Sequence, residues 1–86
     1  MSSTSQDFPS DFPIKVMGRH DSDLRALTQA IVERHAGPIA DSSVKTRTSA
    51  DGNFLALTYV VHATSREQLD KIYRELTACK SVLMAL

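Results

Sequence analysis

The most reactive side chains in this 86-residue chain are three histidines and one cysteine. His20, His35 and His62 stand fifteen and twenty-seven residues apart, whereas metal-binding histidines usually recur within one helical turn or beside cysteine ligands. Cys79 has no second cysteine to pair with, and no motif of a catalytic nucleophile surrounds it. The sequence therefore predicts no enzyme, no cofactor and no metal site.

A different chemistry, anion binding, is conceivable at the junction Gly18-Arg19-His20, which separates an expected strand from an expected helix. Glycine lets a ligand approach the backbone closely, and the start of a helix carries a partial positive charge. Asp21 and Asp23 crowd this helix start, where their oxygens would satisfy the free amides and repel a carboxylate. Two interpretations stay open: a capped turn, or a loop that binds a small anionic ligand.

A third group of residues is expected to meet on one face of a sheet. Lys15, Lys45 and Arg47 would form a basic strip if their strands are neighbours, and Phe54 would lie beside them. RNA-binding sheets stack bases on two or three aromatic side chains, and the ten basic residues are balanced by ten acidic ones. Weak binding of single-stranded RNA is therefore an alternative hypothesis, which requires the three basic residues to be contiguous.

The elements that would position these residues can be predicted from the hydrophobic pattern. Four segments have the alternation or the composition of strands: residues 12–17, 42–49, 54–63 and 81–86. The Asp51-Gly52 pair favours a hairpin turn between the second and third strands. The third segment is the most apolar, so we expect it in the middle of the sheet.

Two further segments have helical periodicity. The first, residues 22–35, would be capped by Asp21 or Ser22. Its expected apolar face consists of Leu24, Leu27, Ile31 and His35. His35 is expected at the edge of the core, with one ring nitrogen bonded to the backbone. The second, residues 64–76, opens with a capping box and turns Leu69 toward the core.

The order of these elements predicts an α+β fold, the ferredoxin-like βαββαβ arrangement. Right-handed crossovers give a four-stranded antiparallel sheet of order 4-1-3-2 with both helices on one face. Residues 1–10 are polar and are expected to form a disordered tail, so residues 11–86 make the single domain.

The other face of this sheet would be left without a helix. Met17, Phe54, Val60 and Leu83 are expected there as an apolar patch, which monomers rarely tolerate. Residues 81–86 also contain no charge or proline that would protect an edge strand from pairing with another chain. The sequence therefore predicts a homodimer or a protein partner, bound through the sheet face or the strand edge.

The sequence shows neither a recognisable secretory signal nor a membrane-spanning segment. The first residues lack the basic start and apolar run of a secretory signal, and no run approaches the roughly twenty residues that span a bilayer. We expect a cytoplasmic protein without a membrane partner.

Four segments resemble the YbeD-like family of small bacterial proteins of unassigned function: FPSDFPIKVMG, ERHAG, DGNFLALTYVVHATSREQLDKIYREL and the terminal LMAL. The likeness runs from about Phe8 to Leu86. It implies a ferredoxin-like fold similar to ACT regulatory domains, which sense amino acids at domain interfaces. It also implies a regulatory role, an effector bound near Gly18, and a partner in lipoate metabolism, because some members are encoded beside lipoate-transfer genes. Leu83 departs from the family pattern, where a charged residue is expected.

Overall fold

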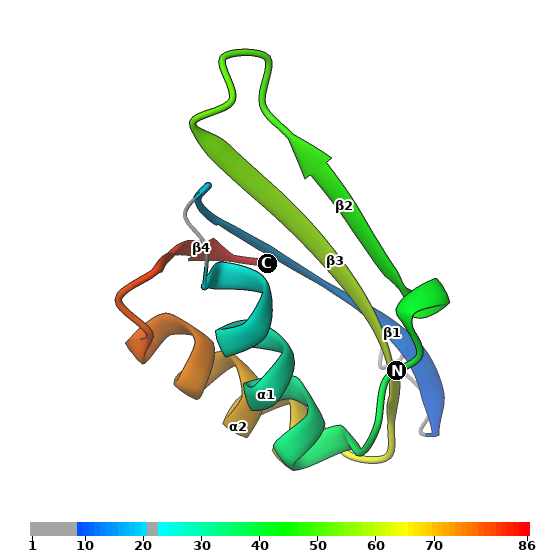
Figure 1. Cartoon of the computed structure of the whole chain (residues 1–86). Helices are drawn as coiled ribbons and strands as arrows, with labels where there is room; N and C mark the ends of the chain where they lie inside the picture. Colours follow the sequence, from blue (N-terminus) through cyan, green and yellow to red (C-terminus); the bar gives the residue numbers. More distant parts are fainter. Residues whose placement is uncertain (1–8, 21–22) are drawn as a thin grey trace, which may run out of the picture.

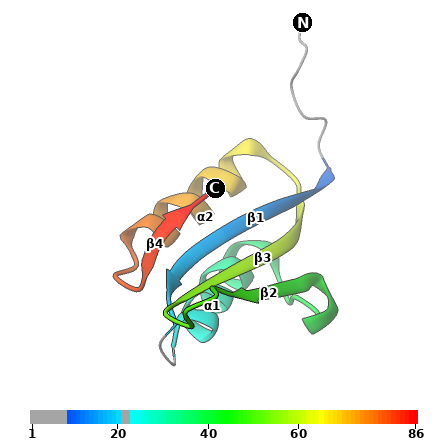
Figure 2. The same ribbon diagram turned by 90° about the horizontal axis from the view of Figure 1, so that it is seen from above.

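The computed structural model describes residues 9–20 and 23–86, which form one sheet and two helices. The elements are β1 (Ser10–Arg19), α1 (Leu24–Ala36), a 3-10 turn (Asp41–Ser43), β2 (Val44–Thr48), β3 (Phe54–Ala63), α2 (Arg66–Ala78) and β4 (Val82–Ala85). Both helices lie side by side against one face of the sheet (Figures 1 and 2). The predicted βαββαβ fold is confirmed.

The sheet has the order β2-β3-β1-β4, which is the predicted order read from the other edge, and every neighbouring pair is antiparallel. β1 is longer than expected, because it pairs with β3 along its whole length, from Ser10 opposite Ala63 to Arg19 opposite Phe54. The predicted disordered tail falls mostly on residues 1–8, which lie outside the described residues. The expected caps Asp21 and Ser22 lie outside them too.

The core fills the space between the sheet and the two helices. Alternate residues of β1 and β3 point into it, as the period of two requires. Its buried apolar members are Ile14, Val16, Leu24, Ile31, Val32, Leu55, Leu57, Tyr59, Val61, Ala63, Leu69, Ile72 and Leu76. Because no side chain of β2 is fully buried, that strand is held mainly by its pairing with β3.

The buried face of helix α1 is shifted from the one predicted: Leu24 and Ile31 are buried as expected, but Leu27 is not. Leu27 is 43 % exposed, whereas Thr28 and Val32 are fully buried, so the prediction that Leu27 faces the core is wrong. The physical reason is a polar contact: the Thr28 hydroxyl lies 2.6 Å from the hydroxyl of buried Tyr59. A buried tyrosine hydroxyl needs such a partner, and burial raises the pKa of Tyr59.

The two helices are joined by polar contacts as well as by the core. Glu75 of α2 accepts hydrogen bonds from Arg34 and from Nε2 of His35, the second at 2.5 Å. A hydrogen bond from the His35 ring to the backbone had been expected, but the ring bonds to the Glu75 carboxylate. Its hydrogen bond, aided by the charge of Arg34, holds the pKa of Glu75 below its usual range. The side-chain amide of Gln68 also donates to the carbonyl oxygen of His35.

Candidate functional site: the open face of the sheet

The face of the sheet opposite the helices, called the open face below, brings the three basic residues together. Lys15 of β1 pairs with Thr58 of β3, and Thr58 pairs on its other side with Lys45 of β2. Arg47 stands two residues further along β2, opposite Ala56. The three basic residues line one shallow depression. The condition set for a basic strip is therefore met.

The basic strip is electrostatically available to an anion. Within the described part of the chain, Lys15, Lys45 and Arg47 form no ion pair with a carboxylate. The one acid of β1 on this face, Asp11, lies at the far end of the strand, 3.4 Å from Nδ1 of His62. Although the whole chain has no net charge, the middle of the open face is locally positive.

Two of the predicted apolar residues meet beside this strip. Met17 and Phe54 line a second, apolar hollow together with Arg47 and Ala56. Met17 pairs with Ala56 on one side and with Met84 of β4 on the other. Met84 therefore extends the apolar area toward the sheet edge, although the sequence pattern had not placed it on this face.

The reason for that omission is a β-bulge in β4. Met84 pairs with Met17 and Val82 pairs with Gly18, so Leu83 is the extra, unpaired residue. A bulge interrupts the strict alternation on which sequence prediction depends, and Leu83 and Met84 are both left exposed. The apolar composition of residues 81–86 was the only signal in the sequence for exposed apolar side chains at this edge.

The fourth predicted residue, Val60, lies apart from the others. It is paired with Pro13 and lines a different depression, near Asp11 and His62. Along β3, Thr58 and Ala56 separate Val60 from Phe54. The structure thus divides the predicted patch into a larger area near β4 and an isolated residue.

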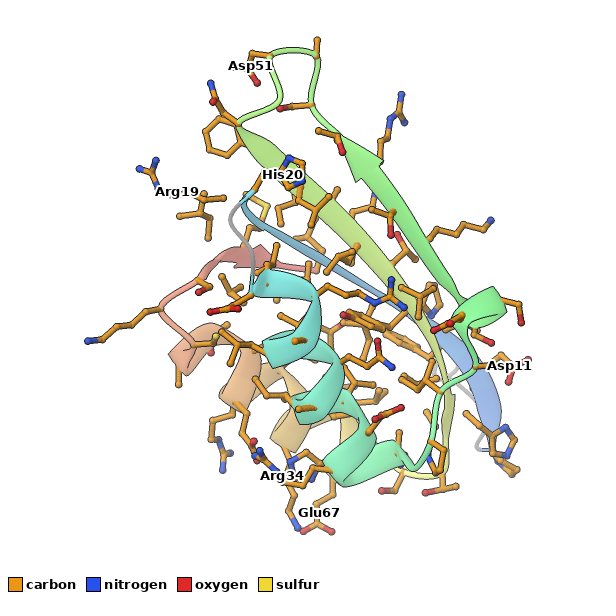
Figure 3. The ribbon with its side chains drawn as sticks, viewed as in Figure 1. Asp11, Arg19, His20, Arg34, Asp51 and Glu67 are labelled. Carbon is orange, nitrogen blue, oxygen red and sulfur yellow. The ribbon has the colours of Figure 1, made fainter. Side chains whose placement is uncertain are left out.

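The three residues of the predicted ligand loop have three different surroundings. Gly18 is buried, with the carbonyl oxygen of Ser81 and the side chain of Leu24 packed directly over it. Arg19 is exposed and pairs with Phe54. His20 lies against the β2-β3 hairpin, where its backbone N–H donates to the Asn53 carbonyl (Figure 3). The side chains of Arg19 and His20 and the buried backbone of Gly18 are therefore not gathered into one site, and the ligand role of these residues stays a prediction.

The remaining candidates carry little further chemistry. No three His, Cys, Asp or Glu side chains of residues 9–20 and 23–86 are grouped as metal ligands would be. Cys79 is a half-buried free thiol at the end of α2. Neither of the helices in the described ranges has both the length and the apolar character needed to cross a membrane.

Comparison with known proteins finds bacterial relatives over most of this length. A family model described as "Protein of unknown function (DUF493)" matches residues 3–86. A UPF0250 protein of Ralstonia nicotianae is 44% identical over 80 residues, which cover 93% of this chain and 82% of that protein. A UPF0250 protein of Chromobacterium violaceum is 47% identical over 81 residues, covering 93% and 90%.

One solved structure shows the same arrangement of elements. The C-terminal domain of the MgtC protein from Mycobacterium tuberculosis superposes with a TM-score of 0.59 and covers 95% of this chain and 89% of that one. Only 13% of the aligned residues are identical, so this likeness supports the fold alone.

Proposed function

This chain belongs to the DUF493 family of proteins of unknown function, as its YbeD-like resemblance had indicated, and we propose that it is a non-enzymatic interaction domain. It works by covering its sheet with a second chain, either another copy or a different protein. The observation that supports this proposal is the set of exposed apolar side chains Met17, Phe54 and Met84 on the open face, with Leu83 exposed next to Met84 in β4. Large apolar areas of this kind usually mark binding surfaces.

A regulatory role is the finer form of this proposal. In it, a small metabolite binds where two subunits meet, and the exposed side chains of Arg19, the last residue of β1, and of His20, which follows it, contribute to the site. The support is the ACT-like resemblance together with the exposure of these two side chains. A partner in lipoate metabolism is supported by the family resemblance alone.

Self-association is the first test of the interaction domain. We expect a homodimer with a dissociation constant on the order of 10 µM. A second copy is present in any purified sample and can cover the exposed apolar side chains. Sedimentation equilibrium between about 1 µM and 1 mM measures it. Lys71→Glu, an exposed change on α2 away from the sheet, should leave the constant unchanged. A chain that is still monomeric at about 1 mM would contradict self-association.

A second candidate function, weak binding of single-stranded RNA, is favoured by one specific observation. Lys15, Lys45 and Arg47 are contiguous, and Phe54 lies next to Arg47 in the adjoining hollow. Proteins that bind single strands combine a positive surface with aromatic side chains on which bases stack. The open face offers one aromatic residue, so we expect weak and sequence-tolerant binding.

RNA binding is tested by fluorescence anisotropy with a labelled single-stranded oligonucleotide at several salt concentrations. Three phosphate contacts would give a slope of log K against log salt of about −2, since each contributes about 0.7. The double variant Lys15→Gln, Phe54→Ala should abolish binding, whereas Lys71→Gln, Arg74→Gln on α2 should not. Binding that is insensitive to salt, or equally weakened by both double variants, would exclude this candidate.

A further inference from the structure

The two edges of the sheet differ in their protection against pairing with another chain. β2 carries the exposed charges Lys45 and Arg47 along its length, a common means of preventing edge association. β4 contains no charged side chain. The large apolar residues at this edge are exposed: Leu83 by 57%, Met84 by 49% and Leu86, which follows the strand, by 63%. Figure 2 shows the two strands at opposite margins of the sheet. The β4 edge is therefore the unprotected one.

The backbone of β4 also has groups directed outward. Leu86 exchanges both backbone hydrogen bonds with Lys15, at 3.0 and 2.7 Å. In an antiparallel pair, the residue next to such a bonded pair turns its N–H and C=O to the other side. The N–H and C=O of Ala85 therefore point away from β1, toward the free edge, where another strand can bond to them.

Association through the open face would meet an electrostatic obstacle instead. A twofold axis places the same surface of both copies in contact, so the basic strips would be brought against each other. Within the described residues, Lys15, Lys45 and Arg47 form no ion pair that would offset this repulsion. The open face is better suited to a partner of opposite charge than to a second copy.

We infer that two copies of this chain join through their β4 edges, antiparallel about a twofold axis, into one continuous sheet. This inference assumes the self-association proposed above and specifies its surface. The apolar side chains of Leu83, Met84 and Leu86 lie at the seam, and the basic strip of each copy, which runs from Lys15 of β1 across to β2, stays uncovered on the open face. Because the bulge at Leu83 limits regular pairing to the last residues of the strand, the dimer is weak.

Two variants of β4 test this geometry by sedimentation equilibrium. Ala85→Pro removes the outward N–H but none of the bonds between β4 and β1, a position where an edge strand tolerates proline. Leu83→Lys places a charge on an exposed position of the same edge. Each should raise the dissociation constant by about tenfold or more. Phe54→Lys on the open face and Lys45→Glu on the β2 edge are the matched controls and should leave it unchanged.

Amide exchange provides a second measurement on the unmodified protein. The Ala85 N–H should exchange slowly at high protein concentration and rapidly on dilution, whereas the Leu86 N–H, bonded within the chain, should change little. If Ala85→Pro alters the circular dichroism spectrum, Leu83→Lys and the exchange of Ala85 decide the question.

The possible outcomes separate this inference from the proposal on which it rests. A wild-type chain that stays monomeric contradicts both. A wild-type dimer that is dissociated by Phe54→Lys but not by the two β4 variants keeps the interaction domain and overturns the edge geometry. A dimer weakened only by the β4 variants, with concentration-dependent exchange at Ala85, supports the inference.

Discussion

Leu69→Ala is expected to lower the free energy of unfolding by about 2 to 5 kcal/mol. Leu69 is 4% exposed and belongs to the buried face of α2 together with Ile72 and Leu76. Truncation removes buried apolar atoms and leaves a cavity that the neighbouring side chains fill only in part. The loss is a large fraction of the total, because a chain of 86 residues has only a small net stability.

Urea denaturation measures this change, at a protein concentration low enough for the chain to be monomeric, because association would stabilise the folded state. Lys71→Ala, an exposed change two positions along the same helix, should alter the free energy by less than about 0.5 kcal/mol. A loss below about 1 kcal/mol for Leu69→Ala would mean that α2 presents another face to the core.

The fold could be predicted because its determinants are local in the sequence. The alternation along β1, the apolar composition of β3 and the periodicity of α2 each specify one element and its buried face. The cap expected at the start of the second helix is formed by Ser65, whose Oγ accepts a hydrogen bond from the backbone N–H of Gln68. Once the elements are known, the handedness of the crossovers leaves very few arrangements.

The errors come from contacts between elements that are distant in the sequence. From the sequence alone, Thr28 is expected to be a polar surface residue. In the structure it is buried, because the hydroxyl of Tyr59, thirty-one positions away, is the partner of its hydroxyl. The position of Met84 depends on a bulge opposite Met17 and Gly18, and no local pattern distinguishes a bulge from a regular strand. Such features are consequences of packing and need the assembled structure.

The candidate site lies between these two cases. The residue types of the basic strip were recognised in the sequence, but their contiguity depends on the register of three strands. A shift of one residue between β2 and β3 would turn Lys45 and Arg47 to the other face. The sequence could therefore state the condition, and the pairing of Lys15 and Lys45 with Thr58 satisfies it.

Gly18→Ala is expected to lower the free energy of unfolding by about 3 kcal/mol, the upper end of the range for an overpacked core. A Cβ atom at this position would lie 2.3 Å from the carbonyl oxygen of Ser81 and 2.8 Å from the Cδ1 of Leu24. The leucine can rotate, but the backbone of Ser81 leads directly into β4 and must move as a whole. We therefore expect β4 to separate from β1, and the exchange of the Leu86 N–H to accelerate.

Gly52→Ala is the matched control, because Gly52 has a positive φ of 79° and no atom within 4 Å of an added Cβ. It should cost about 1 to 2 kcal/mol through backbone strain alone and leave the exchange of Leu86 unchanged. If Gly18 served only as a ligand loop, Gly18→Ala would change neither stability nor exchange. Unchanged values in both measurements would contradict this packing role, whereas acceleration confined to β4 means that Gly18 is required for the last strand to pack.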